Sequence, residues 1–204
     1  RIGLHTGELV PFSAKSPLDA TVFLFINSAH QNPQNFSLRG GHLVLRFWQS
    51  AYPEPGAERL FMRCKRPADD VLADLGVDLD CLRRQERRSV IWIEDYLTAA
   101  ELDSLMQAAH VFLLPSASLH SVSIMQAMAA GAVPVVTDTL GTDRYVTDAV
   151  DSVVLQGVYA SNWRRDSKTG VMIDHYQRNA ELDMRLVQQL VSRLGDLLAD
   201  PARY

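Results

Sequence analysis

The sequence predicts an α/β fold, a doubly wound parallel sheet of about six strands with helices on both faces. Short apolar runs rich in β-forming residues alternate with segments of helical periodicity, which is the order of a βαβ chain. The runs are apolar at consecutive positions, as is typical of strands that are buried on both faces. Hydrophobic residues make up 47% of the 204 residues and charged residues 22%, the composition of a folded rather than a disordered protein.

Each expected strand is a short apolar run bounded by polar, glycine or proline residues. In chain order these runs are residues 21–27, 59–64, 89–93, 111–114, 132–136 and 152–155. Helices are expected between and after them, at residues 38–48, 68–75, 98–109, 124–130 and 180–199. Polar segments without periodicity are expected to be loops: residues 28–35, 76–88 and 116–121.

Local signals predict where the helices begin, end and bury a face. In the first helix, apolar residues recur at the spacing of one helical face: Leu38, Gly41, Leu45 and Trp48. Thr98 and Glu101 form a capping-box pattern at the start of the third helix, and Gly131 closes the fourth. The last helix ends before Pro201. Its expected apolar face consists of Leu186, Leu190, Val191, Leu194 and Leu198.

The chain is expected to be one domain with short appendages. Residues 1–17 are interpreted as an interdomain linker remnant and residues 18–157 as the α/β domain. Residues 158–179 are expected to be an exposed excursion, and residues 180–204 to be a C-terminal helix. Because the chain opens at Arg1, without a methionine, in a loop-like stretch, we expect it to be part of a longer protein.

Charge and cysteine content exclude several classes of partner. The net charge is −4, whereas a nucleic-acid-binding domain is usually basic, so no nucleic acid is expected as a partner. Cys64 and Cys81 lack the spacing of a zinc site, and two reduced thiols suit the cytoplasm, so no metal is expected. The arginines between positions 83 and 88 are interpreted as a solvated surface, with contact to a membrane surface or to an acidic partner as the alternatives.

Residues 115–136 are the most informative stretch, because they run from the end of a strand through a serine-rich loop into a helix, a glycine and another strand. A loop of small residues that leads into a helix directs unpaired backbone N–H groups and the positive end of the helix dipole at one point. The small residues Ser118, Ser121 and Ser123 would let an anion such as a diphosphate approach the backbone. The alternative is that Ser121 or Ser123 only caps the helix.

The order of several motifs resembles a known family. These are residues 4–8 (LHTGE), 109–116 (AHVFLLPS), 126–136 (QAMAAGAVPVV) and 141–148 (GTDRYVTD). Together they resemble the C-terminal, donor-binding half of GT-B glycosyltransferases, and within these the retaining group 1 (family 4-like) enzymes. The resemblance implies a Rossmann-like domain that binds a nucleotide-diphosphate sugar, linked to UDP or GDP, without a metal or another cofactor.

The same resemblance implies roles for individual residues. Ser118 stands at the position of a family glutamate near the transferred sugar, and Gln126 at that of a second glutamate, which binds the ribose. The lysine that clamps the diphosphate falls near Gln34, and no lysine or arginine occupies residues 28–35. The expected donor-binding residues are His120, Ser121, Val122 and Ser123 for the phosphates, Gln126 for the ribose, Asp95 and Tyr96 near the base, and Gln34. His120 is otherwise a loop histidine without a role.

The function implied is transfer of a hexosyl group to a saccharide or glycolipid acceptor, as part of a longer chain whose N-terminal domain binds the acceptor. The fragment by itself is expected to be inactive, because group transfer needs both domains to orient the substrates. The alternative is a non-catalytic relative, a GT-B-like binding or assembly module that has lost the catalytic charges. The expected location is the cytoplasm, with association at a membrane surface as the alternative.

Overall fold

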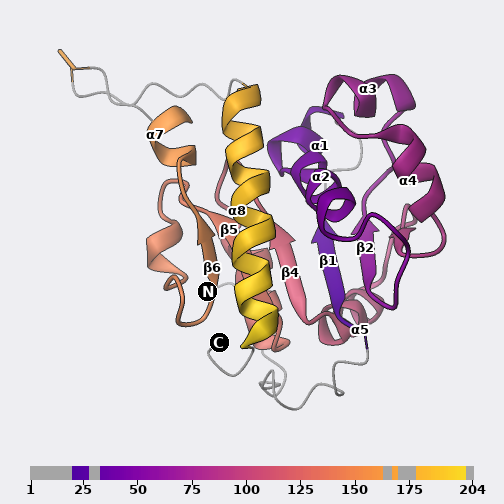
Figure 1. Ribbon diagram of the computed structural model, residues 1–204. Coiled ribbons are helices and arrows are strands. Elements are labelled where there is room, and N and C mark those ends of the chain that lie inside the picture. The colour runs from indigo at the N-terminus through magenta and orange to yellow at the C-terminus, as the bar shows by residue number, and fades with distance from the viewer. Residues whose placement is uncertain (1–19, 28–32, 163–166, 170–177, 201–204) are drawn as a thin grey trace.

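The computed structural model of the chain describes residues 20–27, 33–162, 167–169 and 178–200 (Figure 1). Six parallel strands form one sheet in the order β3-β2-β1-β4-β5-β6, which confirms the predicted fold class. The strands are β1 (Val22–Ile26), β2 (Arg59–Arg63), β3 (Val90–Trp92), β4 (Val111–Leu114), β5 (Val133–Thr137) and β6 (Val153–Leu155). Each of them falls within one residue of the apolar run that predicted it.

Helices connect the strands and cover the sheet. They are α1 (Pro33–Leu38), α2 (Gly41–Ala51), α3 (Asp69–Asp74), α4 (Leu79–Gln85), α5 (Ala99–Ala108), α6 (Ser121–Ala129), α7 (Val158–Asn162) and α8 (Ala180–Ala199), with a short 3₁₀ helix η2 at Thr142–Arg144. No helix within the described residues has both the length and the hydropathy that a transmembrane span requires.

The two faces of the sheet carry different helices, because successive side chains of a strand point to opposite faces. In β1, Phe23 and Phe25 pack with side chains of α2 and α8, whereas Leu24 and Ile26 pack with those of α5 and α6. Figure 1 shows α2 and α8 in front of the sheet. Both faces are therefore buried, which explains why the strands are apolar at consecutive positions.

Two segments that were expected to be loops are helical. Residues 33–35 belong to α1, whose first residue is proline, and a turn at Gly40 separates α1 from α2. The predicted helix over residues 38–48 is therefore confirmed from Gly41 onward but wrong at residues 39 and 40, which form the turn. Residues 79–85, expected in a polar connection, form α4, because the Asp78 carboxylate accepts a hydrogen bond from the Cys81 N–H (2.9 Å) and caps the helix.

The apolar face of α8 differs in part from the prediction. Leu186, Leu190 and Leu194 are buried as expected, but Val191 is 39% exposed. A polar residue of α8, Asp183, is buried, and its Oδ2 lies 3.2 Å from His42 Nε2 in α2. Helix α8 therefore attaches to α2 through both apolar packing and this buried polar contact.

The segment after β6 begins with structure rather than with an exposed loop. Val158 starts α7 and is 2% exposed, within the hydrophobic core. The Asp138 carboxylate accepts hydrogen bonds from the N–H groups of Gly157, Val158 and Tyr159 at the start of this helix. Most of the expected excursion, residues 163–166 and 170–177, lies outside the described residues, as do the expected linker and residues 201–204.

Candidate functional site

The sheet order changes direction between β1 and β4, and in open parallel sheets ligands bind at the carboxyl ends of the strands at such a point. A cavity of about 470 Å³ lies there. The end of β1, the turn between α1 and α2, helix α5 and the start of α6 line it. Its lining residues are Ile26, Arg39, Leu102, Met106, Leu119, His120, Ser121, Val122, Ser123 and Gln126. Five of the predicted donor-binding residues therefore come together in one cavity.

The start of α6 supplies backbone donors to this cavity. His120 is the residue that precedes the helix, and no side chain caps the first turn. Neither Ser121 nor Ser123 acts as the cap, so that interpretation of the serines is not supported. The N–H groups of the first helical turn have no partner within a helix, and the helix dipole adds partial positive charge at the same point. An anion in the cavity would accept hydrogen bonds from these N–H groups and would be attracted by the partial positive charge.

The loop that leads into α6 is held against the turn between α1 and α2. The Leu38 carbonyl accepts hydrogen bonds from the Ala117 N–H (2.8 Å) and from Ser116 Oγ (3.2 Å). At its other side, the Ser116 and Ala117 carbonyls accept hydrogen bonds from the hydroxyls of Thr137 and Thr139. These bonds position the start of α6 between β5 and the turn.

Gly40 makes the close approach of turn and loop possible. Its φ of +78° lies in the left-handed region, and a Cβ at this position would lie 2.2 Å from the Pro115 carbonyl oxygen. Only glycine combines that backbone conformation with that contact. The residue before it, Arg39, is thereby placed beside the cavity.

Arg39 is the site residue that the sequence analysis missed. Arg39 lines the cavity, and its Nη1 donates a long hydrogen bond to the Ile26 carbonyl (3.5 Å). Burial lowers the pKa of Arg39, yet an arginine keeps its charge in proteins. The resemblance placed the family's lysine position near Gln34 and predicted no cation in that loop; Gln34 belongs to α1, and its side chain lies outside the described residues. The pair of glycines that follows Arg39 was the signal that could have located this turn.

His120 contributes polarity rather than charge. Burial, and after it the charge of Arg39, lowers the pKa of His120 to about 4, so the imidazole is neutral near pH 7. Its Nε2 lies 3.1 Å from Ser118 Oγ, within hydrogen-bonding distance. Ser118 itself is half-buried and is not among the residues that line the cavity. A neutral imidazole can exchange hydrogen bonds with a ligand hydroxyl or phosphate oxygen.

The remaining predicted residues divide between the cavity and its surroundings. Gln126 lies in the second turn of α6 and lines the cavity, where its amide can donate and accept hydrogen bonds. Asp95 and Tyr96 follow β3, two strands away from β1, and neither lines the cavity. Tyr96 is 86% exposed, and its ring stacks with the guanidinium of Arg63 at the end of β2.

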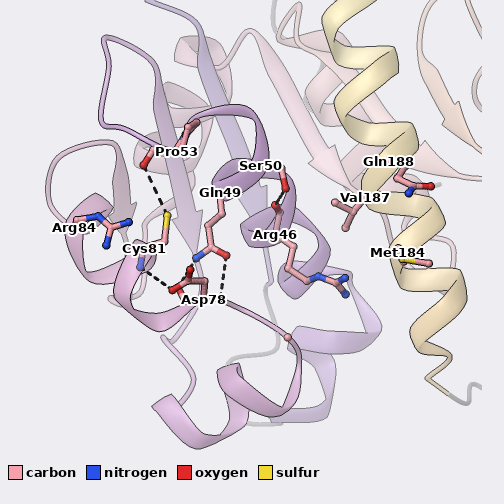
Figure 2. Close-up of a pocket in the computed structure, with 11 residues that line it drawn as sticks. Arg46, Gln49, Ser50, Pro53, Asp78, Cys81, Arg84, Met184, Val187 and Gln188 are labelled. Carbon is pink, nitrogen blue, oxygen red and sulfur yellow. Dashed lines mark hydrogen bonds between the residues drawn. The ribbon is translucent and has the colours of Figure 1, made fainter.

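A second cavity, of about 560 Å³, lies between α2, α4 and α8, on the face of the sheet away from α5 and α6 (Figure 2). Gln49 spans it by donating to the Asp78 carbonyl (2.6 Å) and accepting from the Asp78 N–H (3.1 Å). Arg46 and Arg84 also line it. Because its central polar groups bond one another and it lies away from the carboxyl ends of the strands, the first cavity is the better candidate site.

The chain is similar to known proteins in part of its sequence and in its fold. A family model described as "Glycosyl transferases group 1" matches residues 74–162. The C-terminal domain of LpcC, a glycosyl transferase group 1 family protein from Francisella tularensis, is structurally similar with a TM-score of 0.57. The two are 12% identical, over 90% of this chain and 76% of that domain. WaaG, a glycosyltransferase involved in lipopolysaccharide biosynthesis, gives a TM-score of 0.50 at 19% identity, over 95% of this chain.

This chain spans 48% of the length of the WaaG structure. No curated protein sequence matches it. The resemblance stated from the motifs is confirmed: residues 74–162 match the group 1 glycosyl transferases, and the chain has the α/β fold of a GT-B C-terminal domain.

Proposed function

We propose that this chain is the donor half of a glycosyltransferase and binds a nucleotide-diphosphate sugar in the cavity between β1 and β4. In the complete protein, a second domain would bind a saccharide or lipid-linked acceptor that receives the hexosyl group. One observation carries the proposal. A half-buried arginine and the uncapped start of a nine-residue helix face the same cavity, at the point where the sheet order reverses.

The charge of the cavity suits a diphosphate. Among its lining residues there is one cation, Arg39, and no carboxylate. A guanidinium can bind phosphate oxygens through two parallel hydrogen bonds, and backbone N–H groups at the start of a helix add further donors. Gln126 lies one turn into the helix, where it can exchange hydrogen bonds with ribose hydroxyls. The apolar side, Ile26, Leu102 and Met106, excludes water from these contacts.

A second candidate function is binding without catalysis. Ser118 and Gln126 stand where the family carries glutamates, and none of the residues that line the cavity is acidic. A serine or a glutamine can form hydrogen bonds but cannot supply a carboxylate to the reacting sugar. The same cavity would then serve a binding or assembly module. Donor hydrolysis or transfer by the complete protein would decide against this candidate.

The test of donor binding is calorimetric titration of the chain with inorganic pyrophosphate, UDP and GDP. We expect measurable binding of all three, because the diphosphate contacts are common to them. Arg39→Ala should weaken binding about 10–100-fold, the loss of a charge-assisted hydrogen bond of about 1.5–3 kcal/mol. Arg46→Ala is the matched control, since Arg46 lines the other cavity and should leave the affinity unchanged.

Two results would overturn the proposal. One is the absence of binding of pyrophosphate and of both nucleotides to the folded parent protein. The other is an equal loss of affinity in Arg39→Ala and Arg46→Ala, which would show that general positive charge, rather than this cavity, holds the anion.

A further inference from the structure

The start of α2 directly follows Arg39, the cation of the candidate donor cavity, and it has no side-chain cap. Gly40 is the N-cap residue, and Gly41 is the first residue of the helix. Neither has a side chain that could fix the first turn of α2 against the rest of the protein. His42 is therefore the first residue after Arg39 whose side chain can do so.

His42 is buried where α2 and α8 lie side by side (Figure 1). Its side chain is 0% exposed, and its Nε2 lies 3.2 Å from Oδ2 of Asp183 in α8, which is itself buried. Its Nδ1 has no hydrogen-bond partner among the described residues. A buried polar pair of this kind adds little stability over apolar side chains of similar volume. Stability alone therefore does not account for the pair.

The Asp183 carboxylate is a fixed point for this contact. Its Oδ2 accepts a hydrogen bond from Arg178 Nε (3.0 Å), and Arg178 Nη1 donates to the Asp74 carbonyl at the end of α3 (2.6 Å). Leu182, beside it in α8, is buried in the core. The carboxylate is thus held from α8 and from α3, and the position of His42 depends on it. A negative charge near the start of α2 also interacts favourably with the helix dipole.

We propose that Asp183 and His42 are positioning residues of the donor site, which hold Arg39 in place at the cavity. The inference rests on the proposed function, in which Arg39 binds the diphosphate. On the side of α6, Gly40 and the hydrogen bonds of the Leu38 carbonyl hold the turn that carries Arg39. On the side of α8, the contact between His42 and Asp183 holds it, three residues after Arg39. Helix α8 contributes no residue to the lining of the cavity, yet it fixes the cation there.

The test is titration of the chain with inorganic pyrophosphate, followed by the chemical shifts of backbone amides so that weak binding can be measured. We expect Asp183→Ala to weaken binding about 3–10-fold, within the range of coupling between residues of one network. Asp183→Asn keeps an oxygen that can accept a hydrogen bond from His42, and it should bind as the parent does. His42→Leu should weaken binding as Asp183→Ala does. This variant is expected to fold, because leucine leaves no ring nitrogen unpaired.

A double-mutant cycle with Arg39→Ala separates positioning from a general loosening of the fold. Because Asp183 acts through Arg39, Asp183→Ala should have no further effect on binding in a chain that already carries Arg39→Ala. Leu190→Ala is the matched control. Leu190 is 0% exposed, lies in the same helix as Asp183 and packs in the core that α2 and α8 share. This variant should unfold at a lower temperature but bind pyrophosphate as the parent does.

Three results would reject the positioning role while the proposed function stands. The first is unchanged affinity in both Asp183→Ala and His42→Leu, with binding that still depends on Arg39. The second is the same fold-loss from Asp183→Ala in the parent and in Arg39→Ala. The third is a loss of affinity in Leu190→Ala as large as that in Asp183→Ala. Failure of the parent to bind pyrophosphate, or binding that does not depend on Arg39, rejects the proposed function and the positioning role together.

Discussion

Replacing Gly40 with alanine tests how the turn between α1 and α2 positions the candidate site. The added Cβ would lie 2.2 Å from the Pro115 carbonyl oxygen and 2.8 Å from Pro115 Cγ. The first of these is backbone that cannot move without moving the end of β4. The substitution must therefore separate the turn from the loop that leads into α6, or shift the backbone of one of them.

The expected loss of stability has two sources. An alanine in the left-handed region at φ +78° costs about 1–2 kcal/mol. Separating turn and loop also weakens the two hydrogen bonds that the Leu38 carbonyl accepts from Ala117 and Ser116, each worth about 1 kcal/mol. A total of about 3 kcal/mol corresponds to a fall in Tm of roughly 6–12 °C for a chain of this size.

Thermal unfolding followed by circular dichroism measures this effect, with Gly195→Ala as the matched control. A Cβ at Gly195 would meet no atom within 4 Å, and the residue lies inside α8, four positions before its last residue. That substitution should stabilise the protein by about 0.5–1 kcal/mol, because alanine is the better helix former. If Gly40→Ala unfolds within about 1 °C of the parent, the close approach does not hold the site together and the reasoning fails.

Two further predictions concern stability. Thr98→Ala should lower the free energy of unfolding by about 1 kcal/mol, because Thr98 and Glu101 form the complete capping box of α5. Thr98→Ser keeps the hydroxyl and should keep the stability of the parent. If urea unfolding shows the same loss of stability in both variants, the hydroxyl does not have this role. Burial lowers the pKa of His42, and also that of His120, below the value of about 6.5 in an unfolded chain. Only the unfolded state then gains these protons as the pH falls, so stability should be full above pH 6.5 and decrease from there towards pH 5. Urea unfolding at several pH values tests this. In His42→Gln, the free energy of unfolding should depend less on pH than in the parent. If it depends on pH as steeply as in the parent, other groups are responsible for the pH dependence.

The sequence was sufficient to predict the strands because their burial on both faces leaves a plain signal. Each of the six strands is a run of apolar residues at consecutive positions, and α8 was predicted with its observed bounds. The capping box at Thr98 was also confirmed, since its signal is local to four residues. Such features depend on neighbouring residues alone, so one sequence contains the information.

The misses have tertiary causes. Helix α1 is six residues long and α4 seven, too short for hydrophobic periodicity to distinguish them from polar connections. The buried face of α8 includes Asp183 and excludes Val191, because His42 and Arg178 provide polar partners for the carboxylate. No pattern within α8 reveals a partner that comes from α2, 141 positions earlier in the chain.

The positive charge of the candidate site is the clearest example of a feature that the local sequence does not predict. The loop after β1 lacks lysine and arginine, which suggested that the cations of a diphosphate site are missing. The fold brings Arg39 to the cavity from a turn that Gly40 and the hydrogen bonds of the Leu38 carbonyl hold close to the loop after β4. It brings Arg63 beside Ile26 through strand pairing. Both arginines lie next to the end of β1 although they are 24 residues apart in sequence. Positive charge at the carboxyl edge of this sheet therefore depends on topology rather than on one loop motif, and a search for the motif alone underestimates it.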